Sequence, residues 1–174
     1  NRARDVGKMT REQALTWGVT GPNLRATGLV FAGRRDDPYL VYDRIEFDIP
    51  TEPGGDALSR NLVRRAELKQ SIHILRQVID RLPSIKGPIR CPIPNPLAWN
   101  VPAGEAYTRV ESSKGELAYY VVSSGGDKPY RVHVRGPSSM HAVQVLENLA
   151  VGSRLEDIAQ IMFSLDACPP EVDR

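Results

Sequence analysis

The chain has 174 residues, 41% of them hydrophobic, which suits one domain that buries a core or a part of a larger one. Its formal net charge is only +2, so no strong field favours nucleic acid or an anionic bilayer as a partner. Cys91 and Cys168 fit neither a CxxC ligand pair nor a secreted disulfide framework, which indicates a reducing compartment. No signal peptide or bilayer-length apolar run is recognisable, and the start at Asn1 rather than methionine leads us to expect a fragment.

The first elements are expected to be short. The segment 10–13, Thr-Arg-Glu-Gln, has the form of a capping box and predicts a helix that Gly18 and the Gly21-Pro22 step would end. The stretch that follows is rich in loop residues. Within it, residues 38–42 and 45–49 are predicted as short extended pieces.

The longest helix is predicted over residues 56–82, where apolar residues recur at alternating spacings of four and three. This apolar stripe consists of Leu68, Ile72, Leu75, Ile79 and Leu82. Its width indicates contacts beyond this chain. Prolines then dominate residues 86–102 and predict an extended crossing, in which Ile93, Leu97 and Trp99 dock on a neighbour.

Three strands are predicted next, over residues 106–111, 115–123 and 128–135, with turn residues between them. This pattern indicates an antiparallel meander. The second strand carries apolar residues on both faces, so we expect it to be central.

Two helices are predicted after the strands. Ser138 or Ser139 would cap the first, which Gly152 would close, and residues 153–156, Ser-Arg-Leu-Glu, form a second capping box that would start the next helix. The fold class is therefore α+β, with helices packed against a three-stranded antiparallel sheet. We expect a mainly helical part over 1–100, a sheet over 106–135, and helices with a tail over 138–174.

The last residues form the best candidate for a site. Ionisable groups and one thiol surround the Pro169-Pro170 pair, which fixes φ and removes two backbone donors. We therefore expect these side chains to be held at defined angles rather than on a helix face, where they could line a site. The candidates are Asp166, Cys168, Glu171, Asp173 and Arg174.

Other motifs give weaker signals. The glycines of residues 21–28 match no phosphate loop, and we expect them to form tight turns that aim Arg25 inward, either to a carboxylate or toward a redox centre that its charge would tune. His73, His133 and His141 have no metal spacing and are predicted to have ordinary surface or packing roles. Because the chain has no CxxC, we predict no metal site.

Several motifs in order resemble one protein family. The tail is similar to that of nickel–iron hydrogenase large subunits, but Glu171 takes the position of a cysteine. Segments 17–28, 37–43, 102–107 and 170–174 instead resemble the quinone-site subunit of respiratory complex I, over its second half.

The resemblance implies a role for the whole chain. It would be the C-terminal part of a hydrogenase-large-subunit-like fold and would complete a quinone cavity in an NADH:quinone oxidoreductase, or in one with a related donor. The implied partners are an iron–sulfur subunit that holds a cluster, other complex I subunits and membrane subunits at the cytoplasmic face. Nucleic acid is not expected, and no cofactor is expected on the chain itself.

The tail would then line that cavity. Asp166, Glu171 and Asp173 would hold or relay protons, Arg174 would moderate their charge, and Cys168 would lie on the wall. A buried anchor whose charges only pair with one another is the structural alternative for this tail. Two other classes remain open for the chain: the large subunit of a membrane-bound nickel–iron hydrogenase, and a non-catalytic scaffold.

Overall fold

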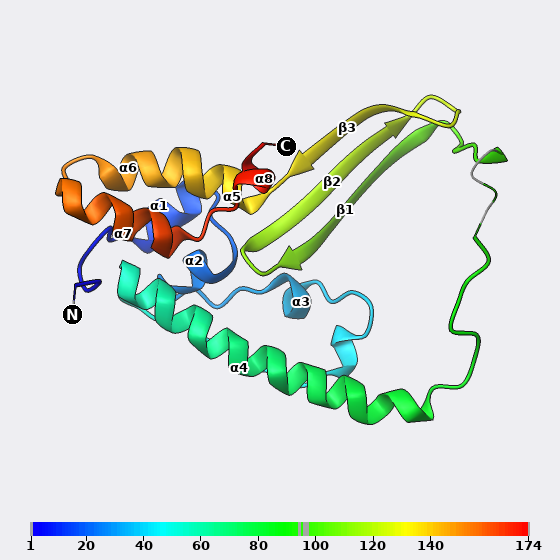
Figure 1. Cartoon of the computed structure of the whole chain (residues 1–174), viewed down its shortest axis with the longest axis horizontal. Coiled ribbons are helices and arrows are strands. Elements are labelled where there is room, and N and C mark those ends of the chain that lie inside the picture. The colour runs from blue at the N-terminus through cyan, green and yellow to red at the C-terminus, as the bar shows by residue number, and fades with distance from the viewer. Residues whose placement is uncertain (1, 94, 96–97, 174) are drawn as a thin grey trace.

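A three-stranded antiparallel sheet and the long helix α4 form the two sides of the molecule, as Figure 1 shows. The computed structural model describes residues 2–93, 95 and 98–173. Before the sheet, the elements are α1 (Arg11–Thr16), α2 (Gly21–Arg25), α3 (Gly33–Asp36), η1 (Tyr42–Arg44), α4 (Ala57–Arg81) and η2 (Leu82–Ser84). The sheet comprises β1 (Gly104–Ser112), β2 (Gly115–Ser123) and β3 (Pro129–Arg135). After it come α5 (Pro137–Ser139), η4 (Met140–Val145), α6 (Leu146–Ala150), α7 (Leu155–Leu165) and α8 (Pro169–Val172).

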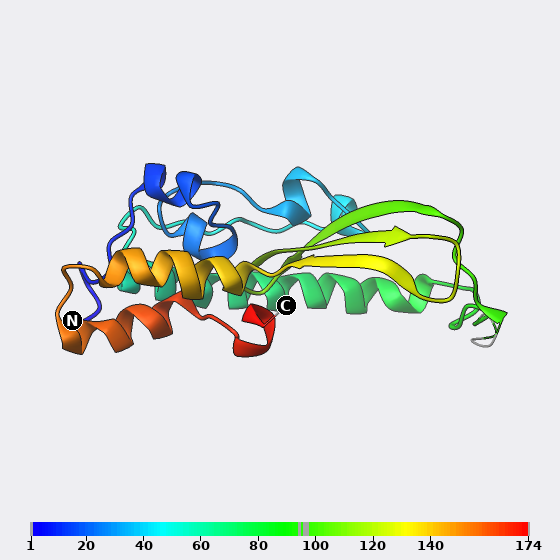
Figure 2. The same cartoon turned by 90° about the horizontal axis from the view of Figure 1, so that it is seen from above.

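The sheet confirms the predicted meander. Its order is β1-β2-β3, so the strand with two apolar faces is central, and a register shift lies between Val122 and Ser123. Much of the sheet surface is exposed, and the helices α2, α3 and α5 contact the strands at the end near the β1–β2 turn (Figure 1 and Figure 2). The α+β class predicted from the sequence is therefore confirmed.

The core lies at the end of the molecule where α1, α2, α6 and α7 meet, away from the β2–β3 turn (Figure 1). It consists of Met9, Ala14, Val19, Leu24, Val145, Leu149, Ile161 and Leu165. The predicted capping box at Thr10 and Gln13 is present and begins α1. Residues from both ends of the chain thus build one core.

The helix α4 begins at the N-cap Asp56, whose carboxylate accepts a hydrogen bond from the Ser59 backbone N–H at 2.8 Å. Its first half supplies the buried Arg60 and Val63. The predicted apolar stripe does not pack within the described chain, since Leu68 is 67% exposed and Ile79 is 62% exposed. None of the helices in the described part is both long enough and apolar enough to cross a membrane.

Backbone meets backbone where α2 crosses the turn between β1 and β2. A Cβ placed on Gly21 would lie 2.5 Å from the Cα of Gly115, and both glycines have positive φ. In addition, the Thr20 hydroxyl accepts a hydrogen bond from the Glu116 N–H at 2.9 Å. The helical end and the sheet are joined at this contact.

Several local predictions were wrong. Residues 38–42 and 45–49 pair with no strand of the described chain, and η1 overlaps the first of these pieces at Tyr42, whereas Ile45 is extended. No side-chain bond of the expected capping box at 153–156 forms, and Arg154 is the N-cap of α7. Neither expected serine caps the helix after the sheet, since its N-cap is Gly136.

The described residues of the proline-rich stretch follow a long open path between η2 and β1, as predicted (Figure 1). The predicted docking of its apolar side chains is not seen within the chain: Ile93 and Trp99 are both exposed. Leu97 lies outside the described residues.

The tail also contains a short helix. Pro169 and Pro170 occupy the first positions of the short helix α8. At those positions a helix does not need the missing N–H groups, and a fixed φ favours it. The pair therefore starts a helix where we expected it to prevent one.

Candidate functional site

Asp166 begins the tail in a left-handed conformation, with φ 55° and ψ 45°, directly after α7. Its carboxylate lies 3.0 Å from the Lys114 Nζ and 3.7 Å from the Arg64 Nε. These cations come from the β1–β2 turn and from α4, respectively. Asp166 thus joins three parts of the fold, and both of its ion-pair partners lie outside the tail.

Glu171 is bound to the start of the helical run that follows the sheet. Its carboxylate accepts hydrogen bonds from the Ser138 backbone N–H at 3.1 Å and from the Ser138 hydroxyl. The Ser138 Oγ in turn accepts a hydrogen bond from the Cys168 N–H at 3.0 Å. A carboxylate at a helix N-terminus satisfies free N–H groups and is favoured by the helix dipole. These contacts favour an anchoring role for Glu171.

Cys168 and Asp173 complete the described part of the tail. Cys168 is a free, half-buried cysteine and the N-cap of α8. Asp173 is exposed and lines the same groove as Asp166. Arg174, the last predicted site residue, lies outside the described residues. Among those that are described, no three His, Cys, Asp or Glu residues are grouped so that they could hold a metal ion.

The groove beside the tail has a volume of about 720 Å³ and a mostly apolar lining. It is bounded by η4, α7 and α8. Its apolar residues include Leu146, Met162, Phe163, Leu165, Pro169 and Val172, and His141 also lines it. The groove falls within the size range of small-molecule sites, about 300–1,000 Å³.

His141 was not predicted as a functional residue, yet it is fully buried at this groove. Its Nδ1 lies 3.2 Å from the Asn23 Nδ2, while its Nε2 has no hydrogen-bond partner among the described residues. Burial, with the nearby charges of Arg64, Arg135 and Arg60, lowers the pKa of His141 to about 4. The ring is therefore neutral near pH 7.

Arg25 points inward, as predicted, but onto carboxylates. Its side chain is 2% exposed, with Nε 2.6 Å from the Glu67 Oε1 and Nη1 2.8 Å from the Glu111 Oε1. Arg34 also approaches Glu111, at 3.5 Å. The charges of two carboxylates and two guanidinium groups thus balance one another. This favours a structural ion pair for Arg25 over the tuning of a redox centre. The predicted tight turn is the short helix α2.

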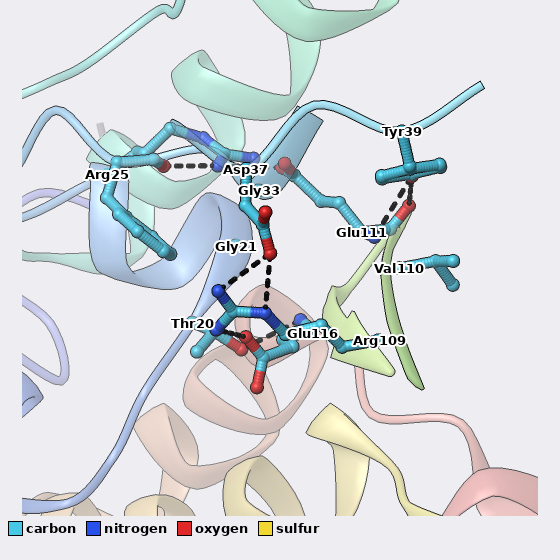
Figure 3. A pocket seen from close by; sticks show the side chains of 11 residues that line it. Thr20, Gly21, Arg25, Gly33, Asp37, Tyr39, Arg109, Val110, Glu111 and Glu116 are labelled. Atoms are coloured by element: carbon cyan, nitrogen blue, oxygen red, sulfur yellow. Dashed lines mark hydrogen bonds and ion pairs between the residues drawn. The ribbon is translucent and has the colours of Figure 1, made fainter. Parts of the chain in front are cut away.

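The cavity next to Arg25 is small. Figure 3 shows its lining, including the Arg109 guanidinium between the Asp37 and Glu116 carboxylates, at 2.9 Å and 3.2 Å. Its volume is about 20 Å³, which is room for about one water molecule. This cluster joins the loop after α3 to the sheet and leaves no space for a substrate.

Comparison with known proteins gives a match along the whole chain. The family model described as respiratory-chain NADH dehydrogenase, 49 Kd subunit, matches residues 1–97 and 95–174. The chain belongs to this family. The 49 kDa subunit family is the one that its sequence motifs resemble.

Curated relatives in the 49 kDa subunit family include subunits of two differently named enzymes. The D subunit of NADH-quinone oxidoreductase is 43% identical in Thermosipho melanesiensis, over 99% of this chain and 47% of that protein. In Syntrophobacter fumaroxidans this subunit is 45% identical, over 100% of this chain and 46% of that protein. The D subunit of the F(420)H(2) dehydrogenase of Methanosarcina mazei is 42% identical, over 99% of this chain and 46% of that protein. The chain spans about half the length of these relatives.

A solved structure confirms the fold. A chain of the membrane-bound sulfane sulfur reductase, an archaeal respiratory membrane complex, is 50% identical and superposes with a TM-score of 0.91. The match covers 99% of this chain and 47% of that one. The arrangement of helices and sheet is therefore that of a respiratory-complex subunit of the 49 kDa family.

Sequence reasoning missed His141 because its position depends on an irregular helix. The π-helical segment η4 contains His141, and such segments are rare and frequently found at functional sites. No local pattern in the sequence signals this segment. The contact with Asn23 spans 118 positions, so it too could not be inferred from spacing.

Proposed function

We propose that the chain is the C-terminal portion, over residues 1–174, of a larger domain that completes the quinone-reduction cavity of an energy-converting oxidoreductase. The match to the 49 kDa subunit family along the whole chain carries this proposal, together with 43% and 45% identity to two NADH-quinone oxidoreductase relatives. The electron donor would be NADH or a related carrier, since one relative is named as part of an F(420)H(2) dehydrogenase.

The tail would form part of the cavity wall. Asp166 and Asp173 line the apolar groove and are the carboxylates that would hold or relay protons. Cys168 would lie on the wall, and Arg174 would moderate the local charge. The contacts of Glu171 with Ser138 support a role in holding the tail in place rather than in moving protons.

The proposed partners follow from membership of such a complex. An iron–sulfur subunit would hold the cluster that delivers electrons, and this chain would bind none itself. Membrane subunits would couple quinone reduction to ion translocation, with the chain peripheral at the cytoplasmic face of the membrane. The exposed apolar stripe on α4 supports extensive contacts with other polypeptide.

A second candidate is sulfane sulfur reduction. The 50% identity and the TM-score of 0.91 with a chain of the membrane-bound sulfane sulfur reductase favour it. The two candidates share the fold and differ in the electron acceptor.

The test is to purify the assembled membrane complex through a tag on this chain and to assay its acceptors. With NADH or reduced F420 as donor, we expect inhibitor-sensitive reduction of a short-chain quinone. Reduction of polysulfide without quinone reduction would favour the second candidate. An intact complex that reduces neither would indicate a scaffold, and stoichiometric nickel would indicate a hydrogenase.

A further inference from the structure

The hydrogen bonds around His141 fix which of its ring nitrogens carries the proton. The Asn23 Oδ1 accepts from the Arg64 Nη2 at 2.8 Å, and the Asn23 Nδ2 donates to the Leu165 carbonyl at 3.0 Å. A guanidinium only donates and a carbonyl only accepts, so the orientation of the amide is determined. The remaining Asn23 N–H therefore donates to the His141 Nδ1. In the neutral ring the proton then lies on Nε2.

His141 thus presents a buried donor that lacks an acceptor within the described chain. The residue is 0% exposed, and its Nε2 has no hydrogen-bond partner there. Leaving such a donor unsatisfied costs about 1–3 kcal/mol. Because His141 lines the groove formed by η4, α7 and α8, an acceptor placed in this groove would remove that cost.

We propose that this groove binds the ring of a quinone and that the His141 Nε2–H donates to one of its carbonyl oxygens. This inference rests on the proposed quinone-reducing function and adds a binding residue to it. The apolar residues Met162, Phe163 and Val172 would contact the ring and its substituents. His141 would fix one end of the headgroup.

The chemistry of the groove favours a quinone over a peptide. A peptide segment brings N–H groups as well as carbonyls, and each buried N–H needs an acceptor. The side-chain acceptors lining the groove are the carboxylates of Asp166 and Asp173, and Asp166 is already paired with two cations. An oxidised quinone has carbonyl acceptors and no N–H or O–H, so it matches a groove with one donor and apolar walls.

The same features disfavour an anionic acceptor such as a polysulfide. The exposed carboxylate of Asp173 lies at the groove and would repel it, whereas the charge of Asp166 is offset by Lys114 and Arg64. Burial and the neighbouring arginines keep the imidazole neutral, because they lower the pKa of His141 to about 4. A neutral donor suits a neutral carbonyl.

Two substitutions at His141 separate donation from packing. His141→Asn keeps an amide near the position of Nδ1, where it can accept from Asn23, but removes the donor. His141→Gln is longer and can place an N–H near the position of Nε2. The matched control is His133→Asn, the same change at an exposed position of β3. Met162→Trp provides an independent test, because it fills the groove from a half-exposed position without altering His141.

The assay uses the assembled complex and a short-chain quinone labelled with ¹³C at its carbonyls. We expect His141→Asn to raise the KM for quinone about threefold to tenfold with little change in kcat, which is the effect of one lost hydrogen bond. The infrared carbonyl band of the bound quinone should move to higher frequency. His141→Gln should restore part of both, Met162→Trp should raise the KM, and His133→Asn should match the wild type.

The inference is overturned if the wild-type complex reduces quinone while His141→Asn and Met162→Trp leave the KM and the carbonyl band unchanged; the proposed function would then stand. If His141→Asn does not assemble, Met162→Trp is the test: a raised KM for quinone supports the proposed groove, and an unchanged KM overturns it. A wild-type complex that neither binds nor reduces the labelled quinone would overturn both proposals.

Discussion

Glu171 accepts two hydrogen bonds from Ser138, one from its backbone N–H and one from its hydroxyl, and thereby ties the tail to the first turn of the helical run after the sheet. This residue takes the place of a cysteine in the similar hydrogenase tail. Here the carboxylate serves as a capping group. The tail is held in place by these contacts with the protein.

The Glu171 contacts predict a stability effect. Glu171→Ala should lower the stability of the assembled protein by about 1 kcal/mol, the usual cost of losing a helix cap, and Glu171→Gln by less. The measurement is the temperature at which this chain dissociates from the purified complex. Quinone turnover per assembled complex should be unchanged. Unchanged stability combined with lost turnover would instead support a proton-relay role.

Asp166 is predicted to act through its charge rather than its backbone. Asn also adopts the left-handed conformation readily, so Asp166→Asn should assemble like the wild type while losing the ion pairs to Lys114 and Arg64. If Asp166 relays protons, quinone turnover falls at least about tenfold, a barrier change of about 1.4 kcal/mol. Lys114→Gln is the control that removes one ion pair and keeps the carboxylate. Equal turnover in all three proteins would contradict the role.

Arg25 is predicted to be essential for folding. Arg25→Gln leaves the carboxylates of Glu67 and Glu111 without this partner in a buried site, a loss of about 3–5 kcal/mol. Little of the chain should then be recovered in the complex. Adding Glu111→Gln should restore part of the yield, because one of the unpaired charges is removed. Arg35→Gln, at an exposed position of α3, is the control and should have no effect.

His141 makes stability depend on pH. Burial, with Arg64, Arg135 and Arg60, lowers its pKa in the folded state to about 4, against 6.5 for the ordinary side chain, so the unfolded chain binds more protons between these values. Stability should therefore be fully present above pH 6.5 and fall by roughly 3 kcal/mol as the pH drops toward 4. Thermal dissociation from pH 7.5 to 5 measures this. His141→Gln should flatten the dependence of stability on pH, and His133→Gln should not. Equal pH dependence in the wild type and in His141→Gln would show that His141 is not the group responsible.

The apolar stripe on α4 predicts an interface. Leu75 is 58% exposed, and its burial against another polypeptide would contribute about 1.5–3 kcal/mol. Leu75→Glu should reduce the amount of partner subunits that copurify with the chain. Lys69→Glu, at an exposed polar position of the same helix, should retain them. Equal recovery with both variants would show that this face stays in solvent.

The sequence was most informative where short-range physics decides the structure. The alternation along 128–135 and the doubly apolar 115–123 predicted both the strands and the central position of β2. The capping box at Thr10 was found for the same reason. Residues 38–49 have strand-like composition, but a strand needs a neighbour, and the described chain supplies none there.

The candidate site was less predictable because it depends on contacts between distant residues. The tail was identified from its residue types, but the capping role of Glu171 requires Ser138, which lies 33 positions away. The orientation of His141 depends on Asn23 and on a π-helical turn. The pair Pro169-Pro170 was misread because proline disfavours the interior of a helix yet suits its first turn.

The touching backbones of Gly21 and Gly115 have a mechanical consequence. With no room for even a methyl group between them, the β1–β2 turn is fixed against α2, and the ion pair of Arg109 with Asp37 holds the same end of the sheet. From this fixed end the strands extend to the 124–127 turn at the outer end of the sheet. A side chain at either glycine would force the turn away from α2 and so displace Lys114, whose Nζ lies 3.0 Å from the Asp166 carboxylate.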